Sequence, residues 1–225
     1  MNELVDFHTH ILPALDHGSK NIEETANQIA LLMEGNIDEV VCTSHFYGHV
    51  HNIHDFLERR SESASLLETY IAENNIDFRF HLGAEVLAFA GMENIERLSE
   101  LAIGNSKTLL IELPYGPLPQ NVESSVVKLM RNGFDILLAH ADRYDEIDIE
   151  KLISAGAKVQ LNASALCKFF VKGTYMRWIR EGNCVAIGSD IHGVDLKAVK
   201  KFQKALKKIQ KYKQCFTNYA KKVLQ

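Results

Sequence analysis

Histidine and carboxylate side chains that can bind metal ions follow short apolar runs throughout the 225-residue chain. His8 and His10 follow the run at residues 4–7, and His140 follows the run at residues 134–139. Runs of this length are typical of buried strands. If the strands are parallel, their carboxyl ends lie on one face, and we expect these side chains to meet there. The candidate metal ligands in this pattern are His8, His10, His17, His45, Glu85, Glu112, His140, Asp190 and His192.

Two pairs of candidate ligands are spaced for a strand. His8 and His10 are two residues apart, as are Asp190 and His192. Residues two apart on a strand point to the same side, so both members of a pair can contact one ion. A carboxylate such as Glu85 can also bridge two divalent ions. A ligand set of imidazole and carboxylate without thiolate favours catalytic Mn, Fe or Zn over a closed structural zinc site.

Arg143 lies three residues after His140. A guanidinium beside a metal cluster would bind the oxygens of a phosphoryl group bidentately; the alternative is an ordinary surface salt bridge. His49, His51 and His54 lie in a loop and a helix start, where a substrate-facing role competes with metal ligation.

Strand-like and helix-like segments alternate about seven times. Strands are expected at residues 4–7, 38–43, 78–82, 108–111, 134–139, 157–161 and 184–187. Helices are expected at residues 21–33, 53–73, 92–98, 122–132, 148–155 and 172–180, with one or two more at 196–224. Strands that are apolar on both faces require an α/β fold with parallel strands covered by helices. An open sheet gathers its site at one switch point, whereas a closed barrel brings all strand ends together, so we prefer the barrel.

Composition predicts one domain over residues 1–225 with a Lys-rich helical segment at about 196–225. Residues 1–4 lack the features of a secretory signal, and no apolar run reaches the roughly 20 residues of a membrane span. The 4 cysteines are scattered, which is typical of reduced thiols in the cytoplasm.

Charge is unevenly distributed although the net charge is only −4. Residues 196–225 carry ten Lys and no acid, so the rest of the chain has 15 basic and 29 acidic residues, or −14. The basic segment is either a solvated helix face or a docking surface for an acidic partner or an anionic membrane. The overall negative charge argues against extended nucleic-acid contact.

Six motifs taken together resemble a known family. They are DFHTHILPALDHG (6–18), TSH (43–45), GAE (83–85), IE (111–112), AHADRY (139–144) and SDIH (189–192). In order and spacing they resemble the polymerase and histidinol phosphatase (PHP) superfamily. Within it, they resemble the bacterial capsular-polysaccharide tyrosine-protein phosphatases of the CpsB/YwqE type, from residue 4 to about 195.

The resemblance implies a distorted (β/α)7 TIM-like barrel with three divalent ions at the carboxyl ends of its strands, expected to be Mn, with Fe or Zn as alternatives. It assigns one ion to His8, His10, Glu85 and Asp190, a second to Glu85, Glu112 and His140, and a third to His45, His192 and the residue before Gly18. The family has Asp-Asp-Gly at that last position, where this chain has Asp16, His17 and Gly18, so either Asp16 or His17 can be the ligand.

The resemblance also implies an activity, hydrolysis of phosphotyrosine in a protein. The expected substrate is a bacterial tyrosine autokinase of capsular or exopolysaccharide synthesis. Arg143, His45 and Lys197 are the candidate catalytic residues; Lys197 stands near where the family has a second Arg and would supply charge without a bidentate fork. Alternatives are another PHP phosphoesterase, such as a histidinol-phosphate phosphatase or a nuclease, and a non-catalytic metal-stabilised interaction module.

Overall fold

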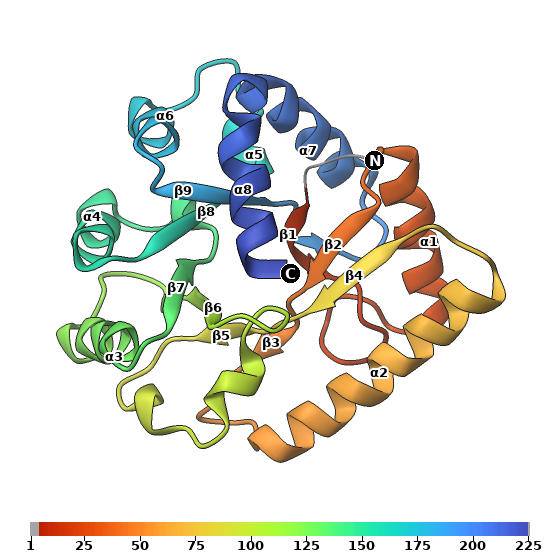
Figure 1. The fold of residues 1–225 in the computed structure, drawn as a ribbon, viewed down its shortest axis with the longest axis horizontal. Helices are drawn as coiled ribbons and strands as arrows, with labels where there is room; N and C mark the ends of the chain where they lie inside the picture. The colour runs from red at the N-terminus through yellow and green to blue at the C-terminus, as the bar shows by residue number, and fades with distance from the viewer. Residues whose placement is uncertain (1–4, 225) are drawn as a thin grey trace.

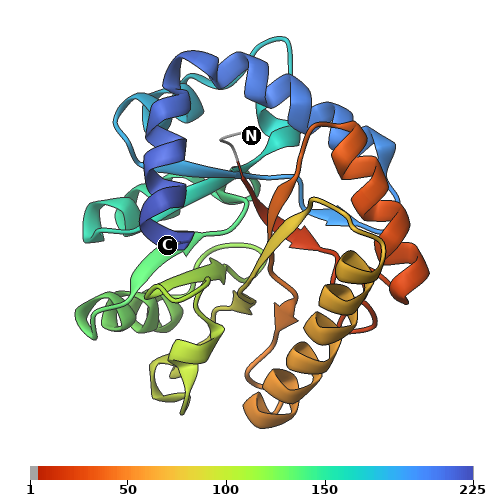
Figure 2. The same ribbon diagram turned by 45° about the vertical axis from the view of Figure 1, so that its right-hand side comes forward.

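The structure is a computed structural model that describes residues 5–224. Strands and helices alternate along the chain, with the helices around the outside (Figure 1), and a turn of 45° shows the same arrangement (Figure 2). The strands are β1 (Asp6–His10), β2 (Glu39–Cys42), β3 (His45–Phe46), β4 (Arg79–Leu82), β5 (Glu85–Leu87), β6 (Thr108–Glu112), β7 (Asp135–Leu138), β8 (Lys158–Asn162), β9 (Cys184–Gly188) and β10 (Ile191–His192). The α-helices are α1 (Ile22–Glu34), α2 (Ile53–Glu73), α3 (Gln120–Arg131), α4 (Glu146–Ala155), α5 (Ala163–Leu166), α6 (Gly173–Arg180), α7 (Leu196–Ile209) and α8 (Lys213–Leu224).

The strands form two hydrogen-bonded sheets in which every strand pairing is parallel. One sheet has the order β10-β1-β2-β4 and the other has the order β3-β5-β6-β7-β8-β9. Most of their strands are buried on both faces, as in β1 and β9, where every residue is buried; β4 is the partly exposed exception. The expected α/β fold with parallel strands under helices is therefore confirmed.

Side-chain caps fix where several helices begin. The side chain of Asn21 accepts a hydrogen bond from Glu24 N at the start of α1, and that of Asn52 accepts one from His54 N at the start of α2. At α7 the Asp195 side chain accepts from two backbone N–H groups. Such caps satisfy N–H groups that have no partner inside the helix.

The first strand lies later in the chain than the sequence predicted. We expected residues 4–7, of which residue 4 lies outside the described part, whereas β1 covers Asp6–His10. His8 and His10 therefore lie within the strand, and both are fully buried. The predicted strand stopped before His8 because the prediction followed the apolar run, and imidazole is polar.

Residues 92–98, which we expected to form one helix, instead form parts of two 3-10 segments, Met92–Asn94 and Leu98–Leu101. The residues that precede the two segments, Gly91 and Arg97, have φ of 92° and 59°. These values lie outside the right-handed helical region, so Arg97 prevents one continuous helix through residues 92–98. The expected C-terminal helical segment is α7 and α8, separated by a 3-10 turn.

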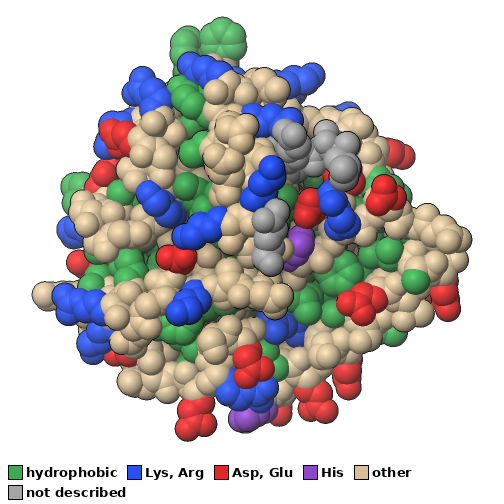
Figure 3. Space-filling view, viewed as in Figure 1, with side chains coloured by type: hydrophobic (Ala, Val, Ile, Leu, Met, Phe, Trp, Pro, Cys, Tyr) green, Lys and Arg blue, Asp and Glu red, His purple; other side chains and the backbone are tan. Residues whose placement is uncertain are grey.

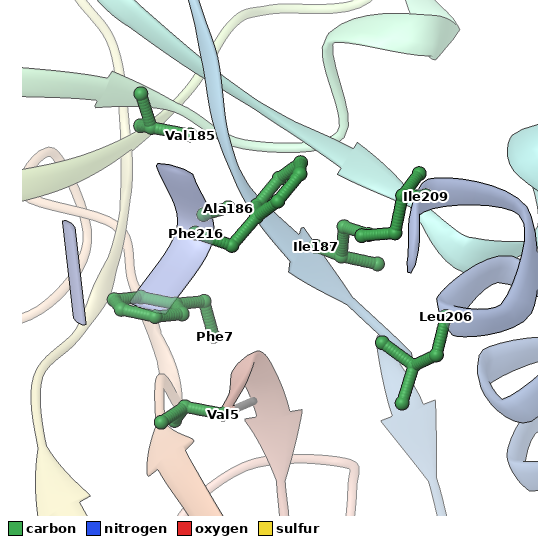
Figure 4. A pocket seen from close by; sticks show the side chains of 8 residues that line it. All are labelled: Val5, Phe7, Val185, Ala186, Ile187, Leu206, Ile209 and Phe216. Carbon is green, nitrogen blue, oxygen red and sulfur yellow. The ribbon is translucent and has the colours of Figure 1, made fainter. Parts of the chain in front are cut away.

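The amino ends of the strands are closed by α8. Val5 and Phe7 of the first strand region pack in one apolar cluster with Ala220 and Val223 of α8. A nearby pocket, lined by apolar side chains that include Phe216, has a volume of about 10 Å³ (Figure 4). This is space for a single water at most, so this end of the molecule is packed core. A functional site must lie at the opposite, carboxyl ends of the strands.

Candidate metal centre

The ten predicted metal ligands converge at the carboxyl ends of the strands. β1 carries two of them, and others end β6 or directly follow β7. The very short strands β3, β5 and β10, which the sequence pattern did not predict, each carry one more. The positions are His8 and His10 on β1, Asp16 and His17 in the loop after it, His45 on β3, Glu85 on β5, Glu112 on β6, His140 after β7, Asp190 after β9 and His192 on β10.

Glu85 lies at the centre of the cluster and is fully buried. Its Oε2 atom is 3.1 Å from His8 Nε2 and 3.4 Å from His10 Nε2. The same oxygen is 3.0 Å from His45 Nδ1, and Oε1 is 2.7 Å from His140 Nε2. One carboxylate thus faces four imidazole rings from three different strand ends, a position from which it can bridge cations.

Three groups of side chains lie close enough to share an ion, with all donor atoms of a group within 4.8 Å of one another. The groups are His8, His10 and Glu85; His45, Glu85 and Glu112; and His10, His45 and His192. The remaining members lie beside them. Asp190 Oδ1 is 3.6 Å from Nε2 of both His8 and His10. Glu112 Oε1 is 3.7 Å from His140 Nε2.

Asp16 and His17 occupy different positions. Both oxygens of the Asp16 carboxylate are hydrogen-bonded within the protein: Oδ2 accepts from His10 Nδ1 at 2.8 Å and from His45 N at 3.0 Å, and Oδ1 accepts from Gly18 N. Asp16 therefore orients His10, whose Nε2 then faces the cluster. The His17 ring is exposed and stacks on His45 with ring centroids 4.8 Å apart.

Several nitrogen and oxygen atoms of this cluster that could bind a metal ion have no hydrogen-bond partner. Among residues 5–224, the buried atoms of the cluster without a partner are Glu85 Oε2, His45 Nδ1, His140 Nδ1 and His192 Nε2. Glu85 Oε2 and His45 Nδ1 are near each other but are not in hydrogen-bond geometry. Buried polar atoms without partners are costly. Nitrogen and oxygen donors left in this way fit divalent cations such as Mn, Fe or Zn.

The charged groups of the cluster set one another's pKa values. Burial disfavours the imidazolium of His10, yet its hydrogen bond to Asp16 raises its pKa well above the ordinary value. Burial also opposes charge on Glu85, but the surrounding histidines, His8 first, hold its pKa well below its usual range. Burial and the Glu85 charge raise the pKa of Glu112 to about 6. Bound metal cations would replace the protons that are now shared between the histidines and the carboxylates of the cluster.

The sequence did not single out Gln160, a buried residue in the middle of β8. Its Oε1 is 3.3 Å from His8 Nδ1 and accepts from His140 N at 2.5 Å, and its Nε2 donates to Asn162 Oδ1. Asn162 Nδ2 in turn donates to Asp190 Oδ2. The available signal was an amide between two apolar residues, Val159 and Leu161, in the predicted strand, since a buried amide needs partners.

Two candidate ligands have left-handed backbone conformations. His140 has φ of 31° and Asp190 has φ of 56°. Non-glycine residues adopt such values rarely and at some cost, and they cluster at functional sites. Hydrogen bonds hold both backbones: His140 N donates to Gln160, and Asp190 N donates to His8 O.

A cleft of about 660 Å³ opens beside the cluster. Glu112, His140 and Arg143 line it together with aromatic side chains that include Tyr47 and Tyr144. The Tyr47 ring stacks on His45 and the Tyr144 ring lies 5.6 Å from that of His140. The cleft therefore runs from the cluster into an aromatic region. His49 also lines it, whereas His51 accepts a hydrogen bond from Tyr47 N.

The two predicted phosphate-binding side chains differ in position. Arg143 is about half exposed, lines the cleft and forms an ion pair with Asp190 Oδ2 through Nη2. Lys197 is exposed on the first turn of α7. Its backbone N–H donates to the Asp195 cap, and none of the ion pairs within residues 5–224 involves its side chain. The structure brings Arg143 to the cluster through Asp190, whereas the role of Lys197 stays a prediction.

The fold and the site define a metal-binding α/β protein in which parallel strands build a histidine and carboxylate cluster at their carboxyl ends. The chain belongs to the capsular polysaccharide synthesis CpsB/CapC family, whose family model matches residues 4–225. The family assignment confirms the resemblance drawn from the sequence motifs.

Named relatives agree with that assignment. The chain is 24% identical to the tyrosine-protein phosphatase YwqE of Bacillus subtilis (strain 168) over 85% of this chain and 78% of the relative. It is 24% identical to the tyrosine-protein phosphatase CpsB of Streptococcus pneumoniae over 85% and 84% of the two chains. A crystal structure from work on these two proteins, described as unique metal-dependent tyrosine phosphatases, matches with a TM-score of 0.81 and 23% identity, over 98% of this chain and 94% of that one.

Proposed function

We propose that this protein is a metal-dependent protein-tyrosine phosphatase. The observation that carries the proposal is the cluster of histidines and carboxylates with unpartnered donor atoms at one end of an aromatic cleft. The names of the relatives agree with this activity. Bound divalent ions would lower the pKa of a water molecule and polarise phosphoryl oxygens, which is the chemistry of a metal-dependent phosphoesterase.

The residues around the cleft fit a phosphotyrosine substrate. Arg143 has five N–H donors, and those that do not face Asp190 can reach phosphoryl oxygens in the cleft. Tyr47 and Tyr144 would flank the phenyl ring of the substrate, because both line the cleft and lie beside His45 and His140. The phenolate leaving group is stable enough to depart with little help from a general acid.

For the ligands, we propose three divalent ions with Mn as the preferred metal. His8, His10, Glu85 and Asp190 would hold one, and Glu85, Glu112 and His140 a second. His45 and His192 would hold the third. Of the two open alternatives for its last ligand, the contacts favour His17, since Asp16 is engaged with His10 and with backbone N–H groups.

A closed barrel accounts for the two sheets. We infer that β2 and β3 are pieces of one strand, interrupted at Thr43 and Ser44, and that β4 and β5 are pieces of another. β9 continues into β10, and the hydrogen bond from Asp190 N to His8 O links that strand to β1. Counted in this way, seven strands close into a distorted (β/α)7 barrel, and the chain is a single domain.

We propose as substrate a tyrosine autokinase of capsular or exopolysaccharide synthesis, because the family is described by capsular polysaccharide synthesis, and a cytoplasmic site of action. Within residues 5–224, no helix combines the length and apolar character needed to cross a membrane.

The test uses protein reconstituted with Mn, Fe or Zn and assayed on a phosphotyrosine peptide, with histidinol phosphate as the comparison substrate. We expect a preference for the peptide and complete loss of activity with a chelator. Alkylation of thiols should leave the activity intact. Burial raises the pKa of the Cys42 and Cys184 thiols, and the partly exposed Cys167 and Cys215 do not line the cleft. Activity that survives the chelator would contradict the proposal, and a preference for histidinol phosphate would redirect it.

A further inference from the structure

Two phenylalanine side chains protrude from the loop that joins α5 to α6. Phe169 is 89% exposed and Phe170 is 83% exposed. Their rings pack edge to face with centroids 4.7 Å apart. Single exposed apolar residues are common on proteins, but an adjacent aromatic pair at the tip of a loop exposes a concentrated apolar surface. We call these two residues the aromatic tip.

Lys208 of α7 is hydrogen-bonded to the backbone of the aromatic tip. Its ammonium donates to the backbone carbonyl oxygens of Lys168 and Phe169. The loop therefore has fixed hydrogen bonds to the helix beside it, and the two rings are held away from the core rather than folded back against it.

A row of lysines on α7 and the turn after it continues from this contact. Lys201, Lys204, Lys208 and Lys211 follow one another at intervals of three or four residues, which places them along one side of the helix. Lys201, Lys204 and Lys211 are exposed. Among the described residues none of the four forms an ion pair, and residues 196–224 contain no acid. We call these four residues the lysine row.

The loop that joins α5 to α6 and helix α7 lie along the same edge of the molecule in both ribbon views (Figures 1 and 2), and Lys208 links them. In the space-filling view, hydrophobic side chains project at that edge with Lys and Arg side chains directly beside them (Figure 3). No residue of the aromatic tip or the lysine row lines the cleft beside the metal cluster.

We propose that the aromatic tip and the lysine row dock the protein onto a lipid bilayer with anionic headgroups. The rings would enter the interfacial region while the lysines contact lipid phosphates, the combination that gives peripheral proteins stable but reversible attachment. A convex tip of two rings fits a fluid bilayer that closes around it. A folded protein partner would need a matching cavity, and acidic charge alone would not require the rings.

The test is flotation of the full chain with vesicles of phosphatidylcholine alone or with about 30% phosphatidylglycerol, which gives the vesicle a negative surface potential that attracts lysines. We expect binding to the anionic vesicles only, weakened by salt. The variant Phe169→Ser/Phe170→Ser should bind at least about tenfold more weakly, since each phenylalanine loses its apolar burial. Lys204→Glu/Lys211→Glu should lose about fivefold or more for each lysine.

Matched controls separate this site from general properties of the chain. Ile147→Ser removes another exposed apolar residue, on α4, and Lys20→Glu/Lys107→Glu makes the same change in net charge at two exposed lysines outside the lysine row. Both controls should bind like the unaltered protein. Failure of the unaltered protein to bind anionic vesicles would overturn the proposal. So would undiminished binding by the Phe169→Ser/Phe170→Ser variant, which would leave only a general attraction to acidic surfaces. Because flotation needs no phosphatase assay, its outcome is independent of the proposed activity.

Discussion

Replacing Gln160 by Met should weaken metal binding although Gln160 is not itself a ligand. The Gln160 Oε1 atom accepts hydrogen bonds on two sides, from the His8 ring at 3.3 Å and from His140 N at 2.5 Å. The bond to His8 Nδ1 keeps the proton on that nitrogen, so the lone pair of Nε2 faces the cluster. Methionine has a similar length but accepts hydrogen bonds only weakly, so the His8 ring loses its orientation.

The expected size of the effect follows from these contacts. Loss of a partner that orients a metal-binding histidine weakens metal affinity by about 10–100-fold. The buried N–H of His140 is also left without a partner, which costs about 1–3 kcal/mol of folding stability. Gln160→Glu keeps the acceptor oxygen but loses the donor to Asn162, so its affinity should lie between those of Gln160→Met and the unaltered protein.

The assay is a competition titration of Mn or Zn against a chelating dye, with urea unfolding of the metal-free protein alongside. Gln203→Met is the matched control, because it makes the same substitution at a glutamine whose amide donates to Gly35 O at the end of α1 and not to a residue of the cluster. The control should bind metal normally. If Gln160→Met bound metal as tightly as Gln203→Met, the reasoning about the orientation of His8 would be refuted.

Four further changes test other parts of the structure. Arg143→Ala should retain bound metal and lower turnover by about 10²–10³, with partial rescue by Arg143→Lys; normal turnover would leave the residue as a surface salt bridge. His140→Ala should lose metal together with activity, as measured by metal analysis of the purified protein, and full metal content would exclude it as a ligand. Gly188→Ala should destabilise the fold by roughly 1–3 kcal/mol, because the new Cβ would lie 2.6 Å from Gln160 Nε2; an unchanged urea midpoint would contradict this. Asp195→Ala should cost about 1 kcal/mol through loss of the α7 cap, with turnover unchanged, and a stability like that of the unaltered protein would show that the cap is dispensable.

The order and type of the main elements were predictable because hydrophobic periodicity follows burial. α2, for example, spans the predicted residues 53–73. The convergence of the ligands was also predictable, since parallel strands place their carboxyl ends together. Strands of two or three residues, such as β3 and β10, were not, because so few residues carry no measurable periodicity.

The finer features of the site depend on contacts that a sequence does not encode locally. Asp16 and His17 are both plausible ligands by type, and backbone N–H groups from residues 18 and 45 bind the oxygens of Asp16. Gln160 lies 20 residues from His140 along the chain and 152 from His8, so its role depends on the pairing of distant strands. Similarly, Arg143 follows a ligand in sequence, but its position on Asp190 is a tertiary contact.

The position of β1 in its sheet has a consequence during synthesis. β1 lies between β2, which emerges from the ribosome soon after it, and β10, in which Ile191 is the partner of Thr9. At translation rates of about 5–20 residues per second, one edge of β1 waits on the order of ten seconds or more for that partner. Throughout this interval the nascent chain exposes an unpaired strand edge, which favours pairing with other chains. The yield of native protein should therefore depend on the rate of translation and on chaperones that cover this edge.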